Sequence, residues 1–335
     1  MQYKKICIIH LNQIGDLVFS LPLLKALKDN QPTAEIHSVV KPFLEELLTR
    51  SPWVDRVILR GNSIRAKLTL LKQIRRNSYD LLISLGRSEQ SLLLASFSGA
   101  KLKAGYSHFF WDRALDLKEV IEGHNSWHNY AKLLRRLNVP FDKNDYVGLL
   151  HFKEGNNPPQ LPKDFAVVSP AASRRRQMKA WDPAKFAELI ILLRQNLNLS
   201  AVLVGSQQDR AYNAEIVASA KQKAGGNPMK IIDLTGHTGL ARLCSIIKHA
   251  SLFVGIDSGI MHLASSIDIP VVGLFGPSDP QYVGPQNQRS LVVRNDEMDC
   301  VPCYLEPCDH KNCMIQLGVD KVFDACRELL TVVGS

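Results

Sequence analysis

Short apolar runs alternate along the chain with segments whose apolar residues recur three or four positions apart. Runs of four to six residues fit buried parallel strands, and the wider spacing fits helices. The first half predicts strands at residues 6–11, 35–40, 56–59 and 80–85 and helices at 21–29, 43–48, 64–76 and 90–97. The second half predicts strands at residues 165–169, 201–204, 231–234, 252–256 and 271–275 and helices at 183–193, 210–220, 240–249 and 260–267. This order predicts an α/β protein with parallel sheets.

A polar stretch at residues 153–163 interrupts the alternation. It holds three prolines, a glycine and two adjacent asparagines, which is the composition of a linker. Because 335 residues also exceed the roughly 250–300 of a single hydrophobic core, we expect two domains. We place them at residues 1–155 and 165–335, as Rossmann-like, doubly wound sheets that face across a cleft, with the C-terminal helix free to pack back on the first domain.

The composition is that of a folded globular protein, with 45% apolar and 22% charged residues. The first ten residues pass from two lysines into an apolar run that is too short for the core of a signal peptide. No stretch approaches the roughly 20 apolar residues that cross a bilayer. We therefore expect a cytoplasmic protein, with association to the inner face of a membrane as an option.

Positive charge is concentrated between residues 57 and 79, and the net charge of +9 favours an anionic partner. The segment has no acidic residue and contains Arg60, Arg65, Lys67, Lys72, Arg75 and Arg76. A solvated helix face is the plain explanation. The segment lacks interleaved aromatics and the chain lacks a nucleic-acid-binding signature, so nucleic acid is not the expected partner. The better functional interpretation is contact with a membrane surface or an anionic acceptor, with Arg60, Arg65 and Lys67 as candidates for acceptor binding.

The turn after the predicted strand 252–256 is the most informative part of the chain. Asp257, Ser258 and Gly259 lead into a helix whose first N–H groups have no internal partner and carry partial positive charge. Such a helix end suits a phosphate, and His262 can add a further donor. The plain alternative is that Asp257 and Ser258 only cap the helix.

Further polar loops follow other predicted strands, at the edge where open α/β sheets bind ligands. They are the basic segment 169–183 with Lys179 and Trp181, the segment from Gly205 to Asp209, and the loop 276–280. We expect the Trp181 indole to pack in the core and the Lys179 ammonium to point inward. After the first strand lies Asp16, which either caps a helix or acts as a general base. No Gly-x-Gly-x-x-Gly or Walker A motif occurs there, so a dinucleotide cofactor is not expected.

Taken together, these segments resemble the ADP-heptose:lipopolysaccharide heptosyltransferases of glycosyltransferase family 9. The resemblance covers nearly the whole chain in order. It rests on Gly15-Asp16 with Leu21-Pro22, Lys179-x-Trp181-x-Pro183, Gly205-Ser206, Leu234-Thr235-Gly236, Asp257-Ser258-Gly259-x-x-His262 and Phe275-Gly276-Pro277-Ser278-Asp279-Pro280. It implies the GT-B fold, with the donor bound mainly by the C-terminal domain. The cluster from Cys300 to Cys313-Met314 resembles the branch that includes the heptosyltransferase II type.

The resemblance also implies a reaction, namely the inverting, metal-independent transfer of a heptose from ADP-heptose to a hydroxyl of the lipopolysaccharide inner core. Asp16 would accept the acceptor proton, and Lys179 would offset the charge that grows on the leaving ADP. The candidate donor-binding residues are Ser173, Gly205, Asp209, Thr238, Asp257, Ser258, Gly259, Met261 and His262. No Asp-x-Asp triplet occurs, so we expect no metal ion in the transfer, and no cofactor.

Two other hypotheses stay open at this point. One is an enzyme of related fold that uses another nucleotide-sugar, and the other is a non-enzymatic basic protein that binds nucleic acid or an anionic membrane.

The cysteines also leave alternatives. Zinc binding, reduced thiols and a disulfide formed on isolation are all compatible with the spacing of Cys300, Cys303, Cys308 and Cys313, near His310. Cys7, Cys244 and Cys326 lie in apolar contexts and are expected in the core.

Overall fold

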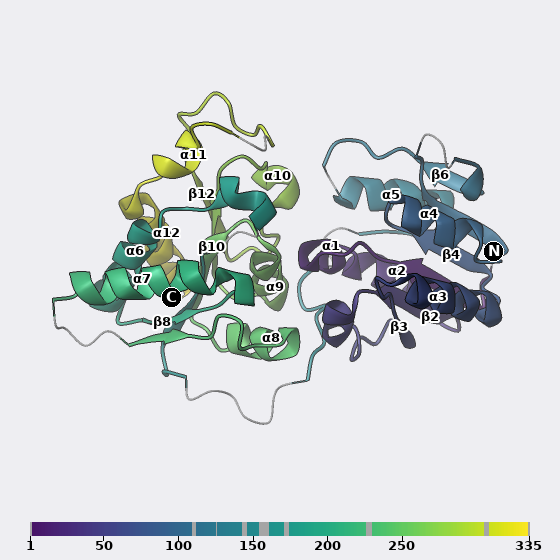
Figure 1. Ribbon diagram of the computed structural model, residues 1–335, viewed down its shortest axis with the longest axis horizontal. Helices are drawn as coiled ribbons and strands as arrows, with labels where there is room; N and C mark the ends of the chain where they lie inside the picture. Colours follow the sequence, from purple (N-terminus) through teal and green to yellow (C-terminus); the bar gives the residue numbers. More distant parts are fainter. Residues whose placement is uncertain are drawn as a thin grey trace. The chain divides into compact units, whose positions relative to one another are not determined.

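The computed structural model describes residues 2–108, 112–124, 126–142, 146–153, 161–170, 174–225, 230–304 and 308–333. The chain divides by its internal contacts into two compact units, Met1–Phe152 and Lys153–Ser335 (Figure 1). Each unit contains one sheet of six strands, and every strand pair is parallel. Within these described ranges, no helix has both the length and the apolarity needed to cross a membrane.

The first unit is a parallel sheet with the strand order β3-β2-β1-β4-β5-β6. Its strands are β1 (Lys5–Ile9), β2 (Glu35–Val40), β3 (Arg56–Leu59), β4 (Leu81–Ser84), β5 (Leu102–Tyr106) and β6 (Leu117–Glu119). The helices are α1 (Ile14–Phe19), α2 (Leu21–Asn30), α3 (Ile64–Asn77), α4 (Glu89–Ser96) and α5 (Ser126–Arg136), with 3-10 turns at η1 (Pro42–Leu47) and η2 (Asp112–Ala114). The order reverses between β1 and β4, which is the switch point of a Rossmann fold.

The second unit repeats this topology, with the order β12-β11-β10-β7-β8-β9. Its strands are β7 (Phe165–Ser169), β8 (Ser200–Leu203), β9 (Ile231–Asp233), β10 (Leu252–Ile256), β11 (Val271–Phe275) and β12 (Ser290–Arg294). The helices are α6 (Pro183–Leu197), α7 (Arg210–Lys223), α8 (Leu240–Lys248), α9 (Gly259–Ile267), α10 (Pro280–Val283), α11 (Asn312–Ile315) and α12 (Val319–Val333), with 3-10 turns at η3 (Arg174–Lys179) and η4 (Gln207–Asp209). Its switch point lies between β7 and β10.

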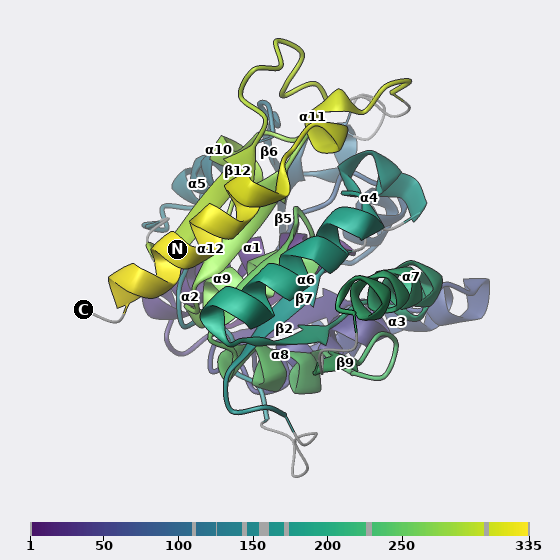
Figure 2. The same ribbon diagram turned by 90° about the vertical axis from the view of Figure 1, so that its left-hand side faces the viewer.

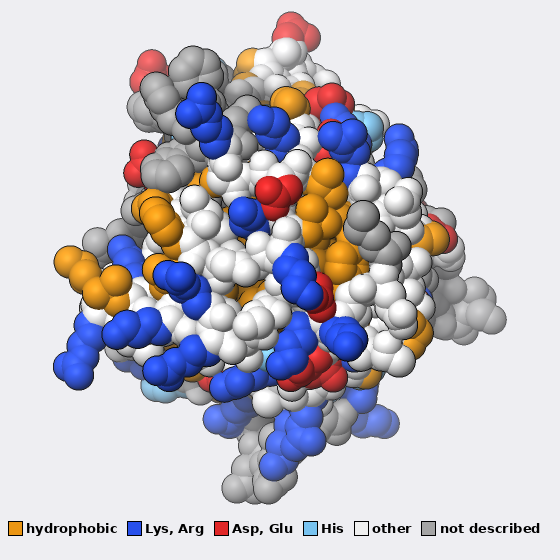
Figure 3. Space-filling model, turned by 90° about the vertical axis from the view of Figure 1, so that its right-hand side faces the viewer, with side chains coloured by type: hydrophobic (Ala, Val, Ile, Leu, Met, Phe, Trp, Pro, Cys, Tyr) orange, Lys and Arg blue, Asp and Glu red, His pale blue; other side chains and the backbone are white. Residues whose placement is uncertain are grey.

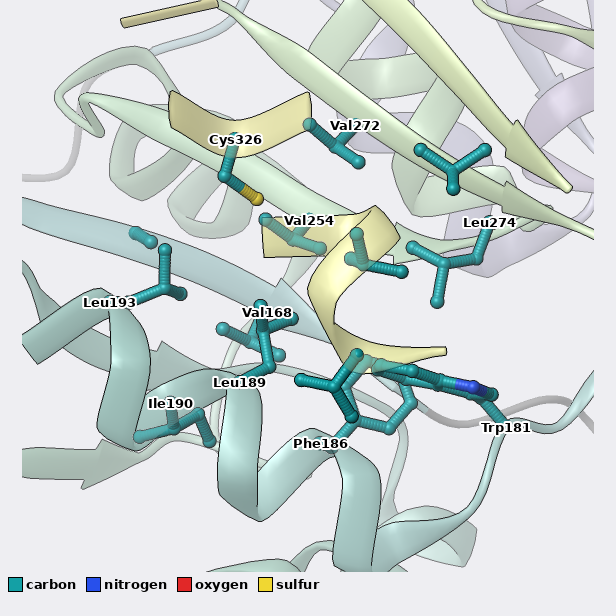
Figure 4. Close-up of a cluster of buried hydrophobic side chains, with 14 of the residues drawn as sticks. Val168, Trp181, Phe186, Leu189, Ile190, Leu193, Val254, Val272, Leu274 and Cys326 are labelled. Atoms are coloured by element: carbon teal, nitrogen blue, oxygen red, sulfur yellow. The ribbon is translucent and has the colours of Figure 1, made fainter. Parts of the chain in front are cut away.

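The core of the second unit explains why its strands read as continuous apolar runs. Strands β7, β10 and β11 are buried at every position, because helices cover both faces of a parallel sheet. Helices α6 and α12 lie side by side against one face (Figure 2). There, Val168, Val254 and Val272 of the strands contact a cluster that includes Leu189 of α6 and Cys326 of α12 (Figure 4).

Trp181 anchors the start of α6 in this cluster. Its side chain is 1% exposed, and the indole N–H donates to the Leu317 carbonyl at 3.0 Å. Burial of a large aromatic ring with its polar atom satisfied is strongly stabilising. The prediction that Trp181 packs in the core is confirmed, as are the core positions of Cys7, Cys244 and Cys326.

The C-terminal helix α12 belongs to the second unit. Besides α6, it packs against β10, β11 and β12 of the second sheet. These contacts place α12 on the second sheet, and its packing against the first domain stays a prediction.

Candidate functional site

The switch point of the second sheet brings together two residues that are far apart in the sequence. Strands β7 and β10 are neighbours, and the segments that follow them leave the same edge of the sheet. Lys179 ends η3 after β7, whereas Asp257 directly follows β10. The two side chains form an ion pair there. The Lys179 side chain thus points inward, which is the direction that the sequence predicted.

Asp257 is the buried centre of this site, with a side chain that is 5% exposed. Its Oδ2 accepts a hydrogen bond from the Lys179 ammonium and another, of 2.6 Å, from the Ser278 hydroxyl. Its Oδ1 lies 4.0 Å from Nε2 of His262. The carboxylate therefore lies among groups from the 3-10 turn η3, the loop before α10 and helix α9, and does not serve mainly as a helix cap.

The surroundings of Asp257 favour its ionised form. Burial opposes the charge, but the nearby Lys179 and His262, with hydrogen bonds from Lys179 and Ser278, outweigh burial and hold the pKa of Asp257 below its usual value. The site therefore holds a carboxylate and an ammonium that neutralise each other away from water. A buried pair of this kind depends on both partners, because either charge alone is costly to bury.

The N-terminus of α9 lies beside this pair. Ser258 is the N-cap with an extended backbone, and its side chain makes no capping hydrogen bond. Among the described residues, the buried Ser258 hydroxyl oxygen has no hydrogen-bond partner. Gly259 begins the helix, and the N–H groups of the first turn lack intrahelical acceptors. These groups are available to an anion at the edge of the sheet.

Ser278 is a site residue that the sequence interpretation left without a role. It lies in the loop between β11 and α10, and its side chain is 2% exposed. Ser278 follows β11, which is adjacent to β10 in the sheet. This position is the signal that could have placed Ser278 near Asp257.

The other residues of the second unit that were predicted to bind the sugar-nucleotide donor differ in how buried they are. Asp209 accepts hydrogen bonds of 2.7 Å from the N–H and from the hydroxyl of Ser206, so its carboxylate caps its own turn. Gly205 is partly buried beside it, since an added Cβ would lie 3.1 Å from the Asp209 Oδ2. Thr238 is partly buried just before α8. Ser173 lies outside the described residues.

Met261 is fully buried in α9. An added Cβ at Gly273 of β11 would lie 2.9 Å from the Met261 sulfur, so this side chain packs the helix onto the sheet. Met261, one of the candidate donor-binding residues, therefore occupies a core position.

Asp16 occupies the switch point of the first unit. It lies in the first turn of α1, after β1, and is partly buried. The N-cap is Gln13, so Asp16 is not the cap of this helix. Burial raises the pKa of Tyr130 well above its usual value, and the charges of Tyr106 and Asp16 add to this effect.

Arg60 is buried, so the prediction that it belongs to an exposed basic patch is wrong. Its side chain is 2% exposed, one of its terminal nitrogens donates to the Ser91 hydroxyl at 3.2 Å, and burial lowers its pKa. The chain turns inward after β3, so this arginine is not part of an exposed acceptor-binding surface. Arg65 is exposed and Lys67 is partly buried on α3.

The four clustered cysteines are unbridged thiols. Cys300, Cys303, Cys308 and Cys313 line one small cavity with His310. Burial, followed by the other three thiols, raises the pKa of Cys313. In the part of the chain that the structure describes, no group of three or more His, Cys, Asp or Glu side chains is arranged to hold a metal ion.

Comparison with known proteins connects this architecture to a class of enzymes. The crystal structure of a glycosyl transferase of family 9 from Veillonella parvula DSM 2008 is similar over 99% of this chain and 98% of that chain, with a TM-score of 0.83 and 23% identity. The structure of Escherichia coli ADP-heptose lps heptosyltransferase II is similar over 99% of this chain and all of that chain, with a TM-score of 0.79 and 22% identity. The fold is therefore of the GT-B type, as predicted.

The family follows from the sequence itself. The model of glycosyltransferase family 9 (heptosyltransferase) matches residues 67–314, and the chain belongs to this family. Lipopolysaccharide heptosyltransferase 3 of Escherichia coli K12 is 26% identical over 94% of this chain and 95% of its own length. The protein is thus a glycosyltransferase, and the hypothesis of a non-enzymatic binding protein is set aside.

Proposed function

We propose that this glycosyltransferase moves a heptose from ADP-heptose to a hydroxyl of the lipopolysaccharide inner core, with inversion at the anomeric carbon. The observation that carries the proposal is the Lys179–Asp257 pair at the switch point of the second sheet, beside the N-terminus of α9. A cation and helix N–H groups at one sheet edge suit a diphosphate. The identities of the sugar and of the acceptor are taken from the names of the heptosyltransferase relatives.

The second unit would bind the donor. The N–H groups of Ser258 and Gly259 would hold the diphosphate, and the Lys179 ammonium would offset the charge that grows on the leaving ADP. Asp257 would keep that ammonium in place until the donor binds. In this division of roles, Asp257 acts on the donor through Lys179.

The first unit would bind the acceptor. As the acceptor oxygen forms a bond to the anomeric carbon, the bond from that carbon to the diphosphate oxygen breaks, and the Asp16 carboxylate takes the hydroxyl proton. The proposal requires the acceptor at Asp16 to reach the donor at Lys179. It needs no metal ion or cofactor, because Lys179 and the helix N–H groups supply the positive charge.

Nucleotide selectivity tests the donor assignment. ADP should stabilise the protein more than UDP, GDP or CMP, because only the folded state binds it. At about 100 times its Kd, a ligand adds roughly 2.7 kcal/mol to the free energy of unfolding, a rise in Tm of about 4 °C for a protein of this length. Differential scanning fluorimetry measures this rise. Preferential stabilisation by UDP or GDP would favour the alternative of another nucleotide-sugar.

Helix α3 fits the expected contact with a membrane surface, which we include in the proposal. Ile64 is 77% exposed and Leu68, one turn further, is 56% exposed. Of the described residues, none makes an ion pair with the neighbouring basic side chains, which are Arg65, Lys67, Lys72, Arg75 and Arg76. Many Lys and Arg side chains lie on the face that Figure 3 shows, with acidic side chains interspersed among them. Exposed apolar side chains among uncompensated cations suit an anionic lipid surface.

Vesicle binding tests this surface. Replacing both Ile64 and Leu68 by Asp should weaken binding to phosphatidylglycerol vesicles more than about tenfold, because each lost apolar insertion costs about 1.5 kcal/mol or more. Val120→Asp is the control, since Val120 is 61% exposed in the same unit but lies outside α3. Co-sedimentation measures binding, and equal weakening by the control would remove α3 from this role.

A further inference from the structure

We propose that Ser278 is a positioning residue which, through Asp257, controls how readily Lys179 is released to the donor diphosphate. The inference rests on the proposed donor site and adds a residue to it. It starts from one atom, Oδ2 of Asp257, which accepts hydrogen bonds from both the Lys179 ammonium and the Ser278 hydroxyl.

The Lys179 ammonium and the Ser278 hydroxyl should respond differently when a diphosphate binds. Lys179 has a long, flexible side chain that is 13% exposed, so its ammonium can turn toward an anion. Ser278 is 2% exposed and has a short side chain, so its hydroxyl stays where it is. Because Asp257 is buried, its charge would be poorly compensated if Lys179 left and no other donor remained. The Ser278 hydroxyl therefore lowers the cost of sharing Lys179 with the donor.

The loop that carries Ser278 is fixed by the cysteine-containing segment. The Pro277 carbonyl accepts hydrogen bonds from the N–H groups of Cys303, at 3.0 Å, and Tyr304, at 2.9 Å. The Tyr304 hydroxyl accepts a hydrogen bond of 3.1 Å from the Asp279 N–H.

The close approach at Gly276 adds a second constraint on the same loop. A Cβ there would lie 2.7 Å from the Met314 sulfur, so only glycine lets the two segments meet this closely. The loop is thus held on both sides of Ser278, and its hydroxyl is preorganised toward Asp257.

ADP affinity in a double-mutant cycle tests the inference. Without the Ser278 hydroxyl, Asp257 should hold Lys179 more tightly, so Ser278→Ala should raise the Kd for ADP about tenfold, as expected for a hydrogen bond to a charged group. In an Asp257→Asn background there is no carboxylate to compensate, and the same change should have little effect. A purely structural role would weaken ADP binding equally in both backgrounds.

Ser265→Ala is the matched control. Ser265 is also a buried serine of the second unit, but its hydroxyl bonds with Asn287 and with the Gln286 N–H, away from Asp257. Isothermal calorimetry gives the Kd values, and urea unfolding verifies that each variant is folded. Wild-type affinity in Ser278→Ala, or equal effects in both backgrounds, would overturn the inference. A wild-type protein that does not bind ADP would instead reject the proposed donor.

Discussion

Asp16→Asn is expected to lower kcat about 10²–10⁴-fold, the range that general-base catalysis contributes, while ADP binding stays unchanged. The amide keeps the size of the carboxylate but cannot accept the acceptor proton. ADP affinity should persist, because the groups proposed to hold the diphosphate all belong to the second unit. The measurement is ADP release with the lipopolysaccharide acceptor, in EDTA because the proposed transfer uses no metal ion, alongside calorimetric binding of ADP.

Asp29→Asn serves as the matched control for this experiment. Asp29 lies in the same unit, on α2, and its carboxylate is paired with Lys25 on the surface at 2.8 Å. Neutralising it should leave kcat unchanged. Full turnover by Asp16→Asn would remove Asp16 from the role of base, and a loss of ADP binding in that variant would place the defect outside the proton transfer.

The central strands could be predicted from the sequence because each is buried on both faces. Strands β7, β10 and β11 have the predicted bounds, as their unbroken apolar runs suggested. Strands β2 and β3 also have the predicted bounds, although β2 contains polar residues and β3 is a partly exposed edge strand. The strands that the apolar pattern missed lie toward the sheet edges, where burial is incomplete. They are β5 with its lysine and glycine, the three-residue β6, and the partly exposed β12. Without a continuous apolar run, such strands depend on pairing with their neighbours.

The sequence predicted at which edge of the sheet the site lies, but it did not predict which side chains contact one another there. Lys179 and Asp257 were both assigned from the loops that follow strands, yet their pairing spans 78 positions of sequence. It depends on β7 being the neighbour of β10, which the local pattern does not contain. The inward turn of Arg60 was missed for the same reason, since tertiary packing decides whether a charge at a strand end is buried.

Lys179→Met is expected to lower both activity and stability. The loss of its charge near the leaving diphosphate should reduce kcat about 10²–10³-fold, the scale measured for removing one preorganised donor. It also leaves Asp257 buried with no ammonium partner, which should lower the free energy of unfolding by about 3–5 kcal/mol. Urea unfolding at pH 7 measures this loss. Lys223→Met is the control, because Lys223 makes an exposed ion pair with Glu188 and an exposed hydrogen bond of 3.5 Å to the Ala184 carbonyl, and its loss should change stability by about 1 kcal/mol or less.

The pH dependence of stability distinguishes this cause from simple loss of packing. In the wild type the pKa of Asp257 is lowered, so its contribution is present above the unfolded pKa and is lost as the pH falls through the folded value. In Lys179→Met, burial should raise that pKa above the unfolded value, so acidification from pH 7 should restore stability as the carboxyl becomes neutral. Adding Asp257→Asn should recover most of the loss at pH 7. A deficit that is the same at pH 5 and pH 7, and that Asp257→Asn leaves untouched, would mean that the pair does not stabilise the fold through its charges.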